Sequence, residues 1–190
     1  MFKQTFAVIG AAFLATSASA ATLDFTEITM GTQTVVTGPS QNLSNAALST
    51  TGAQLAFTEM FGANGAFCGL TQTGSTDCST VTEILFDVPV DSLSFSTYAT
   101  NGGDTLTATI FDAAGTQLGQ LTTPTVDTTV FFGPISGIAR LVLDQTASLA
   151  GNGGGSLVGD FNFSTGNAVP VPAAALLFAP AILALRRKKG

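Results

Sequence analysis

The chain has 190 residues, with 12 acidic and 6 basic side chains, and a formal net charge of −6. All 12 acidic residues lie between residues 21 and 168, where Arg140 is the one basic residue, so this stretch carries 1 − 12 = −11. That balance argues strongly against nucleic acid or anionic lipid as a partner, because a single arginine cannot neutralise a row of phosphates. The stretch also lacks histidine and lysine, which excludes Ser-His-Asp, Cys-His and Schiff-base catalysis and a His-ligated zinc site.

The first 20 residues have the pattern of a secretory signal peptide. Lys3 supplies a positive start, an apolar run covers residues 6–15, and Ala18-Ser19-Ala20 offers the small-x-small pattern that signal peptidase requires. We predict cleavage after Ala20 and exclude residues 1–20 from the fold. An uncleaved anchor helix is the alternative, but threonine and serine side chains end the apolar run early.

The first part of the remaining chain gives mixed signals. Alternation of apolar and polar side chains predicts strands at residues 22–29 and 53–60, with a shorter one at residues 33–37. The leucines and alanines of residues 42–49 have a spacing that predicts a helical turn. The strand at 53–60 is expected to lead into a glycine-rich loop.

Cys68 and Cys78 are the two cysteines of the chain. Export would place them in an oxidising compartment, and the residues between them include turn-favouring Gly74, Ser75 and Asp77. We therefore predict a disulfide, which would stabilise the fold by about 2.5–3 kcal/mol through the entropy of the unfolded chain. A metal or redox pair is the alternative, and it would require further ligands or closer spacing.

From Thr80 onward the alternation is regular, and Pro89 is expected to end the first of a series of strands. Turns are predicted at residues 101–104 and 112–115. Strands recur about every 10–12 residues, with threonine-rich outer faces and no strong helical pattern, so we predict an all-β fold, an antiparallel β-sandwich spanning residues 21–168. Its predicted strands in this part are 82–88, 91–98, 104–111, 117–122, 128–132, 138–143 and 157–164.

The last 22 residues, 169–190, form three segments in a fixed order. An apolar run of 13 residues, 173–185, would span about 20 Å as a helix, short of the roughly 30 Å hydrocarbon core of a bilayer. We therefore predict a short apolar helix that inserts transiently, with positive charges retained on the cytoplasmic side. The flanking segments are Val169-Pro170-Val171-Pro172-Ala173 before the run and Arg186-Arg187-Lys188-Lys189 after it.

This tail resembles the C-terminal sorting signals of the PEP-CTERM type, in particular the VPLPA variant, from which Val171 departs. The resemblance implies that an exosortase-type membrane protease recognises the motif, removes the tail and passes the protein to the cell envelope or surface. A plain tail anchor is the alternative. With signal peptidase acting at the other end, the chain is predicted to be exported and processed twice.

The segment from about residue 80 to 164 resembles exported jelly-roll domains, which are similar to galactose-binding-like and carbohydrate-binding sandwiches. The similarity is carried by the strand order and by the closing Gly159-Asp160-Phe161-Asn162-Phe163. In galactose-binding-like sandwiches a structural Ca²⁺ often joins the first and last strands. The resemblance therefore implies a calcium site made by Asp24 or Glu27 with Asp160, and Asp104 is a second candidate ligand.

Carboxylate pairs are the one enzyme chemistry that the composition leaves open, and four aspartates near strand ends are candidates: Asp87, Asp91, Asp104 and Asp112. Aspartates in turns, however, commonly bond their own backbone. Stacking surfaces for a sugar are few, since the chain has one tyrosine, Tyr98, and no tryptophan.

We predict a non-catalytic component of the cell surface or extracellular matrix, associated with exopolysaccharide. A Ca²⁺-assisted carbohydrate-binding module is the alternative, and a glycoside hydrolase with paired carboxylates is a third hypothesis. Arg140, the sole positive charge of the domain, is predicted to pair with a neighbouring acid such as Asp144, a surface contact of small energetic value.

Overall fold

The computed structural model describes residues 19–28, 34–98, 105–124, 127–146 and 154–165, all within one unit, Ser19–Gly166. The predicted sorting motif, apolar tail and basic end lie outside the described residues, as do Asp104 and residues 1–18 of the predicted signal peptide. Within the described ranges, no helix is long and apolar enough to cross a membrane.

Strands make up nearly all of the regular structure, and every pairing between them is antiparallel. The elements are β1 (Ser19–Thr22), the short 3-10 helix η1 (Phe25–Glu27), β2 (Val35–Val36), β3 (Ser40–Asn42), β4 (Ala46–Thr50), β5 (Gln54–Thr58), β6 (Ala66–Leu70), β7 (Val81–Tyr98), β8 (Thr105–Phe111), β9 (Gln117–Pro124), β10 (Thr129–Phe132), β11 (Ile138–Asp144) and β12 (Leu157–Thr165).

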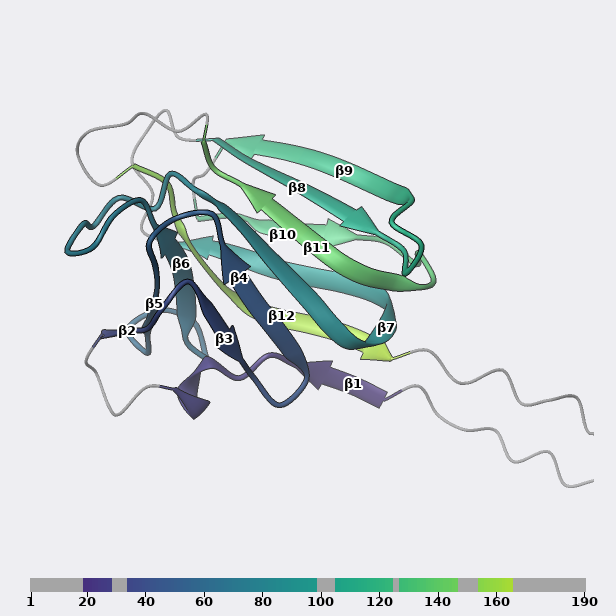
Figure 1. Cartoon of the computed structure of the whole chain (residues 1–190). Helices are drawn as coiled ribbons and strands as arrows, with labels where there is room; N and C mark the ends of the chain where they lie inside the picture. The colour runs from purple at the N-terminus through teal and green to yellow at the C-terminus, as the bar shows by residue number, and fades with distance from the viewer. Residues whose placement is uncertain (1–18, 29–33, 99–104, 125–126, 147–153, 166–190) are drawn as a thin grey trace, which may run out of the picture. The chain divides into compact units, whose positions relative to one another are not determined.

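The 18-residue strand β7 belongs to two layers. Its first half pairs with β4 and β11, and β3, β8 and β9 extend that layer, here called layer A. Its second half pairs with β10 and β12, and β1, β6, β5 and β2 complete the second layer, here called layer B. Figure 1 shows β8, β9 and β11 in front of β10, with β7 turning from one layer into the other. The predicted antiparallel β-sandwich is therefore confirmed.

The turn of β7 lies around Pro89. The ladder between β7 and β11 shifts register there, since Arg140 pairs with Leu85 while Ile138 pairs with Val90. Proline has no N–H to donate, and a bulge is a place where a strand needs none. The prediction that Pro89 ends a strand is wrong for this reason, and the predicted strands 82–88 and 91–98 are one.

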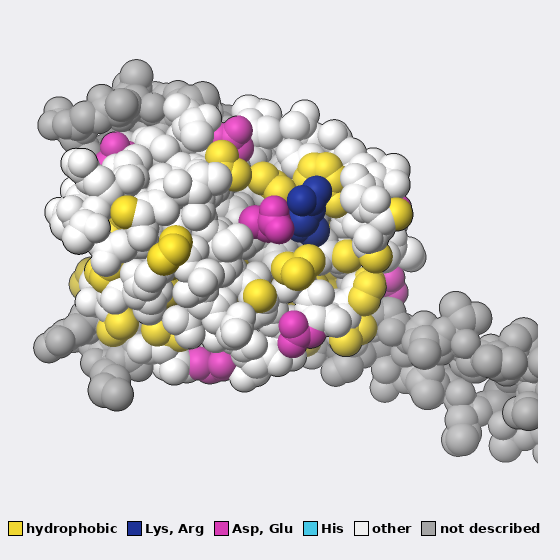
Figure 2. Space-filling view, viewed as in Figure 1, with side chains coloured by type: hydrophobic (Ala, Val, Ile, Leu, Met, Phe, Trp, Pro, Cys, Tyr) yellow, Lys and Arg dark blue, Asp and Glu magenta, His cyan; other side chains and the backbone are white. Residues whose placement is uncertain are grey.

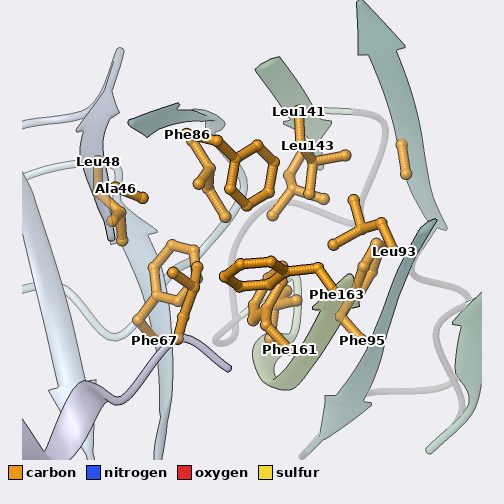
Figure 3. Packing of buried hydrophobic residues seen from close by; sticks show 14 of the residues in the cluster. Ala46, Leu48, Phe67, Phe86, Leu93, Phe95, Leu141, Leu143, Phe161 and Phe163 are labelled. Carbon is orange, nitrogen blue, oxygen red and sulfur yellow. The ribbon is translucent and has the colours of Figure 1, made fainter. Parts of the chain in front are cut away.

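The core between the layers is rich in phenylalanine. Phe25, Phe67, Phe95 and Phe161 are fully buried or nearly so, and the Phe95 and Phe161 rings lie 5.2 Å apart. Figure 3 shows the rings of Phe67, Phe95 and Phe161 in one cluster with labelled leucines of both layers, Leu48, Leu93, Leu141 and Leu143. Fully burying one such side chain stabilises the fold by about 1.5–3 kcal/mol.

Three predictions in the first part of the chain are wrong. In place of the strand predicted at 22–29, Thr22 ends β1 and Phe25–Glu27 form η1, because the Asp24 carboxylate caps the turn by accepting from the Thr26 amide, 2.9 Å away. In place of the helical turn predicted at 42–49, the chain enters β4 at Ala46, and Ala46 and Leu48 both point into the core. The glycine-rich stretch after residue 60 contains a buried strand, β6, and β3 was also not predicted.

The predicted disulfide between Cys68 and Cys78 is confirmed, with Cα atoms 5.6 Å apart. It ties the loop after β6 back onto that strand. The loop is held further by the Cys78 amide, which donates to the Gly154 carbonyl at 2.7 Å. Both cysteines are buried, so the disulfide is part of a packed surface.

Candidate functional site

The outer face of layer B is lined with hydroxyl groups. In β7, Leu93 and Phe95 are fully buried, while Ser92, Ser94 and Ser96 point to the other side and are half-buried. The alternation follows from the period of two along a strand, which puts successive side chains on opposite faces. Three serines therefore form a row on the outside of this layer.

An aromatic side chain stands beside this row. In β10, Val130 and Phe132 are buried, and Phe131 points outward with 62% of its surface exposed. Phe131 pairs with Ser94 in the ladder, and Ser94 pairs on its other side with Asn162 of β12. A benzyl side chain, a hydroxyl and a carboxamide therefore lie side by side across three strands.

These groups border a shallow depression of about 190 Å³, here called the serine groove. Its lining also includes Ala20, the largely buried Phe163, and Ser92 and Ser164, whose hydroxyls bond each other at 2.8 Å. The side chain of Asn162 donates to the Asp160 carbonyl at 2.9 Å. Among the described residues that line the serine groove, none carries a charge.

The far end of the same face is closed by a tether between β12 and the loop after β5. Asp160 is the one non-glycine residue with a positive φ, 49°, in the described ranges. Its Oδ1 accepts from the Ala63 amide at 2.7 Å, and its Oδ2 accepts from the Tyr98 hydroxyl. The Tyr98 ring stacks on Phe61 with centroids 6.1 Å apart. Partial burial, aided by this hydrogen bond, raises the pKa of Tyr98 above its ordinary 10.0.

The structure gives the three predicted calcium ligands separate roles. Asp24 caps η1, the Glu27 carboxylate accepts from the Ser44 amide at 3.1 Å, and both oxygens of Asp160 serve the tether. In the part of the chain that the structure describes, no three acidic, histidine or cysteine side chains gather in a way that could hold a metal ion. Calcium binding stays a prediction, and no step below depends on it.

The structure describes three of the four aspartates considered for paired-carboxylate catalysis, and their contacts differ. Asp112 accepts from the amides of Thr116 and Ala114, and these bonds, that of Thr116 foremost, lower the pKa of its carboxyl. Asp91 accepts from the Gly137 amide at 3.3 Å. Asp87 is exposed where β7 turns. The bonds of Asp112 to the backbone of its own loop are an ordinary role of aspartate in turns, whereas Asp91 accepts from an amide 46 residues away in the sequence.

Arg140 pairs with Glu83, not with Asp144 as predicted. The two side chains lie on neighbouring strands of layer A, 3.4 Å apart, and the guanidinium lies 4.2 Å from the centre of the Phe111 ring. Asp144 instead accepts from the amide and hydroxyl of Thr146. Figure 2 shows the basic side chain beside an acidic one on a mostly uncharged face. The pair is partly exposed, so its energetic value is small.

The predicted signal-peptidase site lies within β1. Ser19 and Ala20 pair with Thr165 and Ser164, and Ala20 also borders the serine groove. Cleavage after Ala20 would leave the second half of β1 in place and remove one wall residue from the serine groove. The predicted processing and the candidate site therefore meet at one position.

The sequence predicted the strand at residues 128–132 but not the role of Phe131 or Asn162. An aromatic residue alternating with buried neighbours was the available signal. That signal indicates a binding surface only once strand pairing places Ser94 and Asn162 near Phe131, and these residues are 37 and 31 positions away in the sequence, respectively.

Comparisons with known proteins give structural likeness alone. No family model and no curated protein matches this chain. Among solved structures, two point mutants of CBM29-2, from work on ligand recognition by family 29 carbohydrate-binding modules, each have 12% identity and a TM-score of 0.37. They cover 73% and 70% of this chain, and 99% and 94% of their own. A further structure, a carbohydrate-binding module of family 29, has 11% identity and a TM-score of 0.36, covering 70% of this chain and 90% of its own.

Proposed function

We propose that the chain is an exported, non-catalytic β-sandwich that binds a neutral polysaccharide in the serine groove. The observation that carries the proposal is Phe131, an exposed aromatic ring beside the hydroxyl of Ser94 and the carboxamide of Asn162. A sugar ring has one face of C–H groups, which suits an aromatic ring, and a rim of hydroxyls, which suits serine and asparagine.

The shape of this face fits a chain of sugars better than a small molecule. Ser92, Ser94, Ser96 and Tyr98 are every second residue of β7 and so lie on one face of the strand. At roughly 3.3 Å per residue, Ser94 and Tyr98 lie about 13 Å apart. The serine groove is shallow, and an enclosed site for a small ligand is usually larger, about 300–1,000 Å³. An extended ligand can lie along the row with its ends in solvent.

Charge selects among polysaccharides. The domain between residues 21 and 168 carries one basic residue against 12 acidic ones, so a polyuronate would be repelled. The serine groove itself is lined by uncharged side chains. A neutral glucan or galactan is therefore the expected class of ligand. Because none of the described residues that line the serine groove has a carboxylate, binding should persist in a chelator.

The delivery of this module is a second part of the proposal. The N-terminal segment supports export through cleavage after Ala20, and the tail from Val169 supports sorting by an exosortase-type protease to the cell surface. Association with extracellular matrix polysaccharide would then be the role of the processed protein. Both statements are supported by sequence pattern.

The binding proposal is tested with affinity electrophoresis on gels containing a neutral β-glucan, a galactan or alginate. Phe131→Ala should abolish retardation by a neutral polymer, while Leu85→Ala, 49% exposed on layer A, should leave it unchanged. Retardation should be equal in EDTA and absent with alginate. Equal retardation of both variants would refute the role of the serine groove, and loss in EDTA would restore the calcium-assisted alternative.

The delivery proposal is tested by the intact mass of the protein from its host, with the sorting protease present and deleted. We expect loss of residues 1–20 in both strains and loss of the segment after about residue 168–173 only when the protease is present. A tail retained in both strains would identify a short anchor instead.

A further inference from the structure

We propose that a pocket beside the disulfide is a second binding site, for a small, uncharged and mainly aliphatic molecule such as a fatty alcohol. The pocket has a volume of about 430 Å³, in the usual range for small-molecule sites. It is separate from the serine groove, and the two share no lining residue. The inference therefore does not depend on the proposed function.

The floor of the pocket is the outer face of layer B at its other end. Val36, Ala56 and Cys68 form one row across β2, β5 and β6, since Val36 pairs with Ala56 and Ala56 with Cys68. Leu70 and Leu157 extend this floor. An apolar surface on the outside of a sheet is a place where a ligand or another chain can be bound.

The disulfide supplies a wall. Cys78 rises from the loop after β6 and packs with Ala56, Cys68 and Leu70 in a small cluster that is distinct from the main core. Cys78 is only 8% exposed, and Ala56 6%, although both border the pocket. The loop is therefore held over the sheet by a covalent bond, and the site is preformed.

The lining indicates the class of ligand. The residues that border the pocket are aliphatic or sulfur-containing, apart from one glycine and the hydroxyl residues Thr34, Ser75 and Thr76. No aromatic ring is among the described residues that line it, so a stacked sugar would find no platform there. A hydrocarbon chain or ring would bury apolar area against this surface, which favours binding. A single hydroxyl on the ligand can hydrogen-bond to one of the three protein hydroxyls.

Charge distinguishes an alcohol from an acid. Among the described residues that border the pocket none is basic, and the domain carries a large excess of acidic residues. A fatty acid would bring its carboxylate into this environment without a partner, which is costly. The matched pair 1-decanol and decanoate differs mainly in that charge, so the alcohol should bind more tightly at neutral pH.

The test uses the neutral fluorescent probe N-phenyl-1-naphthylamine and its displacement by 1-decanol or decanoate at pH 7. The probe should gain fluorescence with the wild-type protein, and 1-decanol should displace it at a concentration at least tenfold below that of decanoate. No fluorescence gain with the wild type, or equal displacement by both compounds, would overturn the proposal.

A matched pair of variants locates the site. Val36 is 45% exposed on the pocket floor, and Val88 is 57% exposed at the turn of β7, outside the pocket. Val36→Glu should weaken probe binding at least tenfold, while Val88→Glu should leave it unchanged, with the same circular dichroism spectrum for both. Equal binding by the two variants would overturn the proposal. Retardation by polysaccharide should be the same for both, which separates this site from the serine groove.

Discussion

Asp160 holds a backbone conformation that few residues adopt, and its carboxylate ties two parts of layer B together. Its φ is 49°, and its side chain accepts from the Ala63 amide and the Tyr98 hydroxyl. Three substitutions distinguish the effect of the backbone conformation from that of the hydrogen bonds. Asp160→Ala loses the hydrogen bonds and places a residue that disfavours positive φ at this position. Asp160→Gly loses the hydrogen bonds but adopts positive φ readily, and Asp160→Asn adopts it too and keeps part of the hydrogen bonding.

The expected losses follow from these contacts. Hydrogen bonds to a charged group contribute about 1.5–3 kcal/mol each, and partial exposure puts both bonds of Asp160 at or below the lower end, about 2–3 kcal/mol together. A left-handed conformation costs alanine about 1–2 kcal/mol more. We therefore expect losses in the free energy of unfolding of about 3–5 kcal/mol for Asp160→Ala, about 2–3 for Asp160→Gly and about 1 for Asp160→Asn.

The assay is urea unfolding followed by circular dichroism, with the disulfide intact. Thermal midpoints should fall by roughly 2–4 °C for each kcal/mol in a domain of this size. Hydrogen exchange at the Ala63 amide should quicken in the alanine and glycine variants. An alanine variant as stable as the glycine variant would refute the argument from φ. Losses below about 0.5 kcal/mol in all three would refute the tether.

Three further outcomes are expected. Gly62 and Gly74 have nearly equal φ angles, 75° and 76°, but a Cβ at Gly62 would lie 2.7 Å from the Asp160 carboxylate, whereas one at Gly74 would meet nothing within 4 Å. Gly62→Ala should therefore lose at least about 1 kcal/mol more in the free energy of unfolding than Gly74→Ala, as measured by urea unfolding. The raised pKa of Tyr98 means that the folded state binds the phenolic proton more tightly than the unfolded chain does. Its contribution to the free energy of unfolding is therefore present below about pH 10 and is lost as pH rises through the pKa of the folded state. Unfolding at alkaline pH should show the stability of the wild type falling relative to that of Tyr98→Phe. Phe161→Ala should cost about 3–5 kcal/mol because the ring is fully buried, whereas Phe131→Ala should stay within about 0.5 kcal/mol.

The predicted fold depended on regular alternation, and it succeeded where apolar and polar side chains alternate along a strand. In β8, for example, Leu106, Ala108 and Ile110 point inward, and the threonines between them do not. It failed in β6, where all five residues are buried because the loop with Cys78 covers the outer face. Two-sided burial removes the alternation that identifies a strand.

Predictions from local sequence were also wrong where pairing with distant strands decides the secondary structure. The spacing of leucine and alanine in residues 42–49 fits a helical turn, yet Ala46–Thr50 pairs with β7 and gains a ladder of backbone bonds there. Pro89 reads as a terminator from its missing N–H alone. In the sheet it lies at a register shift, where that donor is not required. Neither outcome follows from the neighbouring residues.

The candidate sites depend on contacts between distant residues. The disulfide could be predicted because two cysteines in an exported chain have one partner each. The tether could not, since Tyr98 and Asp160 are 62 residues apart and an aspartate in a strand has no local signature of this role. The carboxylate that resemblance assigned to calcium is thus occupied by two protein donors.

The tether lies between two unlike surfaces on the same face of layer B. On one side, β7, β10 and β12 present hydroxyls and one exposed ring; on the other, β2, β5 and β6 present an aliphatic floor. Asp160 belongs to β12, which has residues in both surfaces, Asn162 in one and Leu157 in the other. If β12 positions both, Asp160→Gly should weaken retardation by polysaccharide and binding of the neutral probe together. If only one of the two is weakened, the surfaces are positioned independently, and β12 is merely where they meet.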